Sequence, residues 1–553
     1  MKEYYPKRET IPTAWLVAPK FQPDFIWSPD EQGWQVTNIG RESIDKHCET
    51  GDGNKPAIIC LETGEMFTFR QIKEASDRLA GALIEAGVKV GERLALRYAS
   101  RPAAIIAATA AWKAGAVVVP IPTQARRSEI EFYLKDTDAR WVIVLNEGDL
   151  YSELEAVLPA TGVKGVIIGE KSPGMAGESL EALIEQGNAS LAETVHTEAN
   201  DLAVIWHTGG TTGVPKATYH THRRWLIAGK RLAATWELDA HQRWIYGIPI
   251  SNVAGFLGRF ICVLQHGATL IEPKSLSGTD VLEAIVEQQV THLLGIPVTL
   301  SLLADASSDK TQALSSLQEV YAPFLVTGAG NLYERWEKAG YRLKNPLGSS
   351  ILCQWFIGPV AGETMPPFAL GKPVAGYEVR IVDIAGASIT SLQPGAVGRI
   401  AVRGPTGLTY WNRSELQAVE VRQGWTITDD LGRMDDKGIV WFLGRLNNLI
   451  VTAGYKVAPG EVEQVLLTHP QVREAAVTGI ADPLRGQVVA AFIVVKEGEG
   501  DDALAHELQE WCKRHLAPYK YPRKVFFCRA FPRDPVGKVQ IRTLVHSMTG
   551  VEP

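Results

Sequence analysis

The stretch DLAVIWHTGGTTGVPK, residues 201–216, joins an apolar run to a loop of glycines and threonines that ends on a lysine. The apolar run predicts a buried strand. Glycine tolerates the backbone angles that let several N–H groups after such a strand point at one anion. The pattern therefore indicates a polyphosphate-binding loop, whose candidate ligands are Thr208, Gly209, Gly210, Thr211, Thr212, Gly213 and Lys216.

Two observations limit that interpretation. A Walker-type loop requires the pattern GxxxxGK[ST], but here Gly213 is followed by Val214, Pro215 and Lys216, so a P-loop kinase or ATPase is disfavoured. A single glycine–threonine loop is also compatible with an ordinary surface turn. The phosphate-binding interpretation therefore depends on other segments of the chain.

Composition places the chain among ordinary globular proteins. Its 553 residues suggest three or four domain-sized units. A net charge of -6 does not indicate binding to nucleic acid or to an anionic membrane. The six cysteines form no CxxC pair, which favours a reducing compartment. The N-terminus has no signal-peptide core, and Lys113 interrupts the longest apolar run. We expect a soluble, cytoplasmic protein without a membrane span.

The order of the predicted elements defines an α/β fold. Residues 67–88 have helical periodicity, and residues 102–121 predict a buried helix followed by a buried strand, so βαβ units and a parallel sheet are expected. From about residue 371 the strands become short, with glycines between them, which indicates an antiparallel β subdomain. We therefore expect an N-terminal domain, 1–445, with its β subdomain at 371–445, and a small mobile α+β C-terminal domain, 446–553.

The sequence TGGTTGVPKATYHTH, residues 208–222, resembles the signature phosphate loop of the AMP-forming acyl-CoA synthetases, members of the adenylate-forming superfamily. Further segments extend the resemblance over nearly the whole chain. GWTITDDLGR is similar to the family segment that carries the ribose-binding carboxylate, which implies this role for Asp430. FPRDPVGKVQIRTL resembles the C-terminal segment of the catalytic lysine, which implies that Lys538 contacts both reacting partners.

The resemblance also implies roles around the boundary between the domains. In GRLNNLIVTAGYKVAPGEVE, Arg445 would contact the nucleotide and Asn447 would be the hinge. Gly454, Tyr455 and Lys456 would lie where the pantetheine of coenzyme A (CoA) enters. The segment VTGAGNL stands where the family binds adenine, which makes candidates of Gly328, Ala329 and Gly330.

Two segments depart from the family pattern. LCQWFIGPVAGETMPP replaces the usual aromatic-Gly-x-Thr-Glu motif, so Trp355 or Phe356 is the candidate for stacking on adenine. Either a local shift lets Glu363 bind Mg²⁺, or the chain lacks that metal ligand and Glu363 is a surface carboxylate. In IPISNVAGF, Asn252 replaces the usual histidine or aromatic gate beside the acyl site, and Gly255 is a second substrate-site candidate.

The implied activity is that of a carboxylic acid–CoA ligase that uses ATP, Mg²⁺ and coenzyme A and passes through an acyl-adenylate. A short-chain, medium-chain or aromatic acid fits the resemblance best. Four aromatic residues could line such a pocket or could be ordinary core: Trp244, Tyr246, Phe256 and Trp355. A peptide-synthetase adenylation domain is disfavoured, whereas an adenylate-forming enzyme with another acceptor and a non-catalytic nucleotide-binding homologue stay open.

Overall fold

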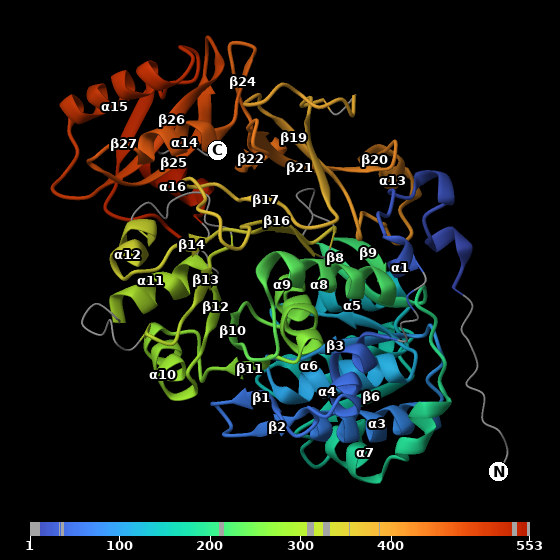
Figure 1. The fold of residues 1–553 in the computed structure, drawn as a ribbon. Helices are drawn as coiled ribbons and strands as arrows, with labels where there is room; N and C mark the ends of the chain where they lie inside the picture. Colours follow the sequence, from blue (N-terminus) through green and yellow to red (C-terminus); the bar gives the residue numbers. More distant parts are fainter. Residues whose placement is uncertain are drawn as a thin grey trace.

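The computed structural model describes residues 11–32, 34, 38–208, 215–306, 314–323, 332–352, 354–385, 388–533 and 539–549. Within these ranges, no helix is both long and apolar enough to cross a bilayer. The chain forms two large sheets with their helices, then a region of short antiparallel strands, and then a smaller C-terminal unit (Figure 1).

The first large sheet contains the strand of the glycine–threonine segment. Its order is β7-β6-β5-β3-β4-β8-β9, and all its neighbours are parallel except the antiparallel pair β8–β9. Its strands are β3 (Arg93–Arg97), β4 (Val117–Pro120), β5 (Trp141–Leu145), β6 (Gly165–Gly169), β7 (Glu178–Ser179), β8 (Leu202–Thr208) and β9 (Lys216–Thr221). Strands β3 and β4 are buried at every position, as expected for parallel strands covered on both faces.

The second large sheet has the order β14-β13-β12-β10-β11-β1-β2, with an antiparallel pair only at β1–β2. Its strands are β1 (Pro56–Cys60), β2 (Met66–Thr68), β10 (Arg243–Gly247), β11 (Thr269–Glu272), β12 (His292–Gly295), β13 (Glu319–Tyr321) and β14 (Leu343–Lys344). The prediction of an α/β domain built on parallel strands is confirmed.

Helices between the strands supply much of the shared core. Helix α3 (Phe69–Glu85) begins two residues later than predicted, because Met66–Thr68 pairs with β1. Thr68 and Gln71 then form a capping box that satisfies free N–H groups at the helix start. Helix α4 (Pro102–Lys113) is almost entirely buried, in agreement with its apolar sequence.

One lysine ends that apolar helix inside the core. The Lys113 side chain is fully buried, and its Nζ lies 2.7 Å from Asp45 Oδ1 and 2.6 Å from Asp77 Oδ1. It also donates a 2.9 Å hydrogen bond to the Ser76 hydroxyl. A buried ammonium is tolerated only when such partners compensate for its lost hydration. The lysine that interrupts the apolar run is therefore a buried, fully paired core residue.

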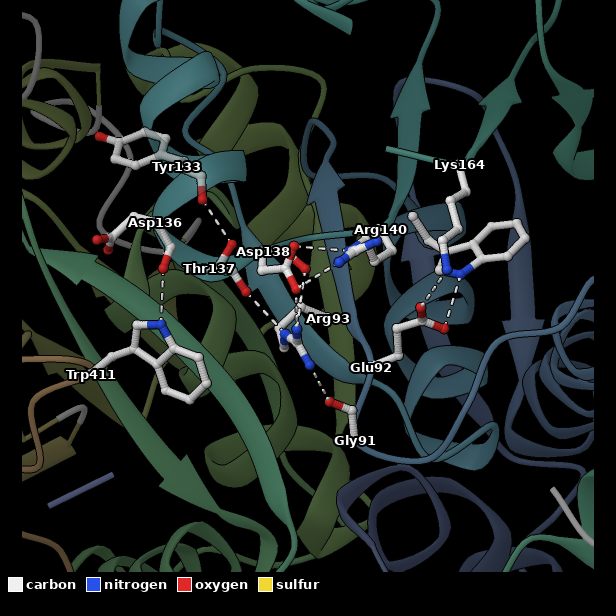
Figure 2. A network of polar contacts seen from close by, with 11 residues as sticks. Gly91, Glu92, Arg93, Tyr133, Asp136, Thr137, Asp138, Arg140, Lys164 and Trp411 are labelled. Atoms are coloured by element: carbon white, nitrogen blue, oxygen red, sulfur yellow. Dashed lines mark hydrogen bonds and ion pairs between the residues drawn. The ribbon is translucent and has the colours of Figure 1, made fainter. Parts of the chain in front are cut away.

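A second buried cation connects a strand with the end of a helix (Figure 2). Arg93, at the start of β3, donates to the Thr137 carbonyl at 2.9 Å and to Asp138 Oδ2 at 2.9 Å. Asp138 follows α5 (Arg127–Thr137) in a left-handed conformation and also accepts a hydrogen bond from Arg140. This network fixes the C-terminal end of α5 against the first large sheet.

Short antiparallel strands follow the two large sheets, and they begin at Leu347, before the predicted start near residue 371. A three-stranded sheet joins β15 (Leu347–Ser349), β16 (Gln354–Gly358) and β17 (Lys372–Pro373). A five-stranded sheet has the order β18-β19-β21-β20, with β22 paired to β21. Its strands are β18 (Glu378–Val382), β19 (Gly398–Arg403), β20 (Val421–Arg422), β21 (Trp425–Met434) and β22 (Val440–Arg445).

The C-terminal unit has its own sheet and its own core. Its sheet order is β24-β23-β26-β25, with β27 paired to β26. The strands are β23 (Ile450–Thr452), β24 (Tyr455–Val457), β25 (Val472–Asp482), β26 (Gly486–Val495) and β27 (Lys524–Phe527). The helices are α14 (Pro459–Leu467), α15 (Asp502–His515) and α16 (Ile541–Thr549). Separate apolar clusters on the two faces of this sheet show how the unit buries its own core.

Candidate functional site

The glycine–threonine segment connects two antiparallel strands. Thr208 ends β8 and faces Lys216, the first residue of β9, and the Thr208 hydroxyl donates to the Lys216 carbonyl at 3.1 Å. A strand precedes the loop, as expected, and a second strand follows it before α8 (His222–Trp236). A Walker loop leads directly into a helix, so the topology also differs from a P-loop. Gly209, Gly210, Thr211, Thr212 and Gly213 lie outside the described residues.

Lys216 faces an acidic and aromatic pair contributed by a distant segment. Its Nζ lies 3.7 Å from Glu420 Oε1 and 5.8 Å from the centre of the Tyr410 ring. The Tyr410 hydroxyl donates to Glu420 Oε2 at 2.8 Å. Burial raises the pKa of Glu420, and the nearby charge of Lys216 and the Tyr410 hydrogen bond oppose that rise. The Lys216 ammonium could therefore exchange its contact with the Glu420 carboxylate for a contact with a phosphate.

Backbone pairing explains why these groups meet. Tyr410 forms an isolated antiparallel bridge with Thr218 of β9, and the Trp411 N–H donates to the Ala217 carbonyl at 2.9 Å. This contact places the following helix, α13 (Ser414–Glu420), so that its last residue reaches Lys216. No motif in the sequence marked Tyr410 or Glu420, because nothing in the local sequence shows that they meet a strand about 200 residues earlier.

Asp430 lies inside β21, directly opposite Arg445 on β22. Its side chain is 9% exposed, and its Oδ1 lies 3.3 Å from Arg445 Nε, whereas the Arg445 side chain is 51% exposed. Burial raises the pKa of Asp430, the charge of Arg445 lowers it, and that of Asp429 raises it. The charge of Asp429 also raises the pKa of Glu420. Val421, the residue after Glu420, pairs with Thr426 of β21, so the strand of Asp430 lies beside the segment that faces Lys216.

Trp355 and Phe356 lie on β16, where every residue is buried. The exposed fractions are 3% for Trp355 and 0% for Phe356. The Trp355 indole N–H donates to the Tyr246 hydroxyl at 3.0 Å, and its ring lies 6.4 Å from that of Trp236. The structure thus places both adenine-stacking candidates within the core. The other adenine candidates, Gly328, Ala329 and Gly330, lie outside the described residues.

Glu363 is an exposed carboxylate that is already paired. Its side chain is 42% exposed, and its two oxygens lie 2.9 Å and 2.7 Å from Lys372 Nζ. Across the described ranges, no three histidine, cysteine, aspartate or glutamate residues gather in a way that could hold a metal ion. As arranged here, Glu363 and its neighbours do not fit a Mg²⁺ site, since the nearest partner of its carboxylate is a cation.

Asn252 and Gly255 shape a short helix near the end of β10. The Asn252 side chain caps α9 (Val253–Leu257) by accepting a 2.9 Å hydrogen bond from the Ala254 N–H. A Cβ at Gly255 would collide with the Pro249 carbonyl, so glycine lets the helix approach that backbone. The sequence predicted Asn252 only as a substitute for the gate residue and did not predict that it caps a helix. Of the other acyl-pocket candidates, Trp244, Tyr246 and Phe256 are buried.

The predicted hinge and CoA segment lie just after β22. Asn447 is exposed within a short 3₁₀ turn, Leu446–Asn448, between β22 and β23. Gly454 and Ala453 form the turn of the β23–β24 hairpin, and both have positive φ, as a tight hairpin turn requires. Tyr455 and Lys456 follow on the exposed β24, where the Tyr455 ring stacks on Tyr519 at 4.5 Å. Lys538 lies outside the described residues.

Comparison with known families identifies the chain as an AMP-binding enzyme. A model of the AMP-binding enzyme family matches residues 44–411, and a model of the AMP-binding enzyme C-terminal domain matches residues 461–538. Since the first match alone covers more than half of the chain, the chain belongs to the adenylate-forming acyl-CoA ligase family of AMP-binding enzymes.

Individual relatives are similar to this chain over nearly its full length. The acetyl-coenzyme A synthetase of Bacillus subtilis is 27% identical over 533 residues, with 92% of this chain and 90% of the relative covered. The anthranilate CoA ligase AuaEII, solved in complex with anthranoyl-AMP, is 25% identical with a TM-score of 0.82, covering 94% of this chain and 98% of that chain. The amide bond synthetase McbA from Marinactinospora thermotolerans is 26% identical with a TM-score of 0.78, covering 92% and 99%.

Proposed function

We propose that this chain is an ATP-dependent carboxylic acid–CoA ligase that acts on a short-chain, medium-chain or aromatic acid. The observation that carries the proposal is that Glu420, which faces Lys216 at the end of the glycine–threonine loop, is followed directly by Val421 of β20, and β20 pairs with β21, the strand of Asp430. The Lys216 ammonium is suited to bind phosphates, and the Asp430 carboxylate is suited to accept hydrogen bonds from vicinal hydroxyls. Both kinds of group are present in a nucleoside triphosphate.

In the proposed first step, an oxygen of the substrate carboxylate attacks the α-phosphorus of ATP. A new acyl–phosphate bond forms, the bond to the β-phosphate oxygen breaks, and pyrophosphate leaves with the electron pair. The loop and Lys216 would neutralise the triphosphate, and Asp430 would accept hydrogen bonds from the ribose. Lys538 would bridge the two reacting anions and so reduce their repulsion. No step is assigned to Mg²⁺, since Glu363 is paired with Lys372.

In the proposed second step, the thiol of CoA attacks the acyl carbon and AMP leaves with the electrons of the acyl–oxygen bond. The thiol proton passes to solvent. The C-terminal unit would turn about Asn447, withdraw Lys538 and bring Gly454, Tyr455 and Lys456 beside the thiol. The exposure of Asn447 and of the β23–β24 hairpin supports this assignment. A rotation of this kind lets one cavity present two sets of groups in turn.

A test is pyrophosphate release by the full-length protein with ATP and a panel of carboxylic acids, with and without CoA. We expect release with at least one acid, formation of an acyl-CoA, and a large loss of release in Lys538→Ala. Lys513→Ala removes an exposed cation of the same C-terminal unit, which pairs with nearby Glu510 and lies over the Tyr521 ring, and is the matched control. Turnover of Lys538→Ala equal to that of the control would refute the role of Lys538.

A second candidate is an adenylate-forming ligase with an acceptor other than CoA. The similarity to an amide bond synthetase, which is as extensive as the similarity to the CoA ligases, favours it. The same assay separates the two, because pyrophosphate release that yields an amide from an added amine but no thioester from CoA identifies the second activity. ATP binding without any AMP formation across the panel would instead identify a nucleotide-binding homologue without turnover.

A further inference from the structure

A buried carboxylate joins two segments that border the glycine–threonine loop. Asp136 lies in the last turn of α5, and its side chain is 7% exposed. Its Oδ2 lies 3.1 Å from His207 Nε2, and its Oδ1 accepts a 2.7 Å hydrogen bond from Arg413. Each carboxylate oxygen thus has its own partner, and the two partners come from distant parts of the sequence.

Each partner leads to one end of the loop. His207 immediately precedes Thr208, after which the loop begins, and its side chain is 2% exposed. Arg413 immediately precedes α13, whose last residue, Glu420, contacts Lys216 at the other end of the loop. The Trp411 indole N–H also donates to the Asp136 carbonyl at 3.0 Å (Figure 2). Asp136 therefore contacts the residue before Thr208 directly, and it is linked to Lys216 through Arg413 and Glu420 at the two ends of α13.

The charges of this cluster favour a fixed arrangement. Burial raises the pKa of Asp136, but the hydrogen bonds and charges of His207 and Arg413 outweigh burial and lower it overall. Burial lowers the pKa of the His207 imidazole, and the hydrogen bond with Asp136 and the charge of Asp136 oppose that fall. The Tyr133 ring, 4.4 Å from the His207 ring, restricts the imidazole further. A charge-assisted pair with defined donors is strongly directional.

We propose that Asp136 is a positioning residue for Lys216. Through His207 it holds the end of β8, and through Arg413 it holds α13, whose last residue, Glu420, faces the Lys216 ammonium, so it sets the affinity for the β- and γ-phosphates of ATP. This inference rests on the proposed function, because it assumes that Lys216 binds a triphosphate. Asp136 acts through His207 and Arg413 and does not itself touch the nucleotide.

The chain contains a matched control two residues away. Asp138 is also a partly buried carboxylate at the end of α5, and it too is paired with arginine side chains, Arg93 and Arg140. Figure 2 shows these contacts on the side of Asp138 that leads to β3, whereas the Asp136 carboxylate points away from them. If Asp136 only held α5 in place, replacing Asp136 and replacing Asp138 would have the same effect on the affinity for ATP.

The experiment compares wild-type protein, Asp136→Asn and Asp138→Asn, all full length. Binding of ATP and of AMP is measured by calorimetry, and unfolding by a thermal melt. We expect Asp136→Asn to weaken ATP binding by roughly tenfold while AMP binding changes less than about twofold, since a small displacement of positioning groups is costly. Asp138→Asn should lower the melting temperature and leave the preference for ATP over AMP unchanged.

Three results would overturn the inference. They are an Asp136→Asn protein with wild-type ATP affinity, an equal loss of ATP and AMP affinity in that variant, and the same ATP-specific loss in Asp138→Asn. Wild-type protein that binds neither nucleotide would refute the proposed function, and the inference with it. Should Asp136→Asn fail to fold, His207→Asn and Arg413→Lys each weaken one side of the cluster, and each should show the ATP-specific loss.

Discussion

Asp430 and Arg445 occupy directly opposed positions on the antiparallel strands β21 and β22, with 3.3 Å between Asp430 Oδ1 and Arg445 Nε. The carboxylate is buried while the guanidinium is half exposed, so one partner is fixed and the other can move. The sheet therefore presents a desolvated carboxylate beside a cation that can turn toward a ligand. A buried carboxylate of this kind is suited to accept hydrogen bonds from sugar hydroxyls.

Replacing Asp430 by alanine should raise the dissociation constant of ATP by roughly ten- to hundredfold, the value of a hydrogen bond to a charged group. Calorimetry measures this directly. Asp429→Asn is the neighbouring control, because Asp429 is 47% exposed and pairs with Arg399. For wild-type protein, 3′-deoxy-ATP should bind more weakly than ATP, and this difference should vanish in Asp430→Ala. A difference that persists in the variant would assign the ribose to another residue.

Lys216→Ala should weaken ATP binding much more than AMP binding, since the proposed partners of the Lys216 ammonium are phosphates that AMP lacks. We expect a loss of roughly tenfold for ATP, in the range of one charge-assisted contact. The control is Lys230→Ala, which removes an exposed lysine of α8 that lies over Trp34. Equal losses for ATP and AMP in Lys216→Ala would argue against a triphosphate role for the loop.

Glu463 predicts a pH dependence of stability. It lies fully buried on α14, its Oε1 accepts a hydrogen bond from the Val477 N–H, and burial raises its pKa to about 8. Unfolded chains ionise this carboxyl near its ordinary pKa of 4.5, while the folded protein keeps it protonated. The free energy of unfolding should therefore decrease as the pH rises from about 5 to about 8.

The matched variant for this effect is Glu463→Gln, which keeps an acceptor for Val477 and cannot ionise. In chemical denaturation of the full-length chain, its stability should be nearly independent of pH over the same window, apart from contributions shared with the wild type. At pH 8 it should exceed the wild type by a few kcal/mol, about 1.4 per unit of pKa shift. Parallel pH profiles for the two proteins would show that Glu463 is not the titrating group.

Lys113→Ala should destabilise the protein by roughly 3–5 kcal/mol, because Asp45 and Asp77 lose the fully buried cation that they share and keep only the partly exposed Arg41 and Lys73. A thermal melt or urea titration measures the loss. Lys73 also pairs with Asp77 but is 31% exposed, so Lys73→Ala should cost about 1 kcal/mol or less. Similar losses in the two variants would mean that burial of Lys113 does not determine the cost.

The elements that were predictable are those defined by local chemistry. The sequence of a parallel strand such as β4 is a continuous apolar run, and the sequence of α3 has helical periodicity. The change to short strands separated by glycines predicted the antiparallel sheet. The first residue of α3 was less predictable. Phe67 and Thr68 fit the helical periodicity, but their pairing with β1 takes them into a strand.

The sequence alone determined the fold class, the family and the position of the loop between Thr208 and Lys216, because each depends on residues that are neighbours in the chain. Only the tertiary structure decided that Glu420 and Tyr410 face Lys216, that Asp136 joins His207 to Arg413, and that Trp355 and Phe356 are buried. The physical reason is that a side chain's partners follow from how strands and helices pack. A strand pairing such as that of β9 with residues 409–411 brings together groups about 200 positions apart.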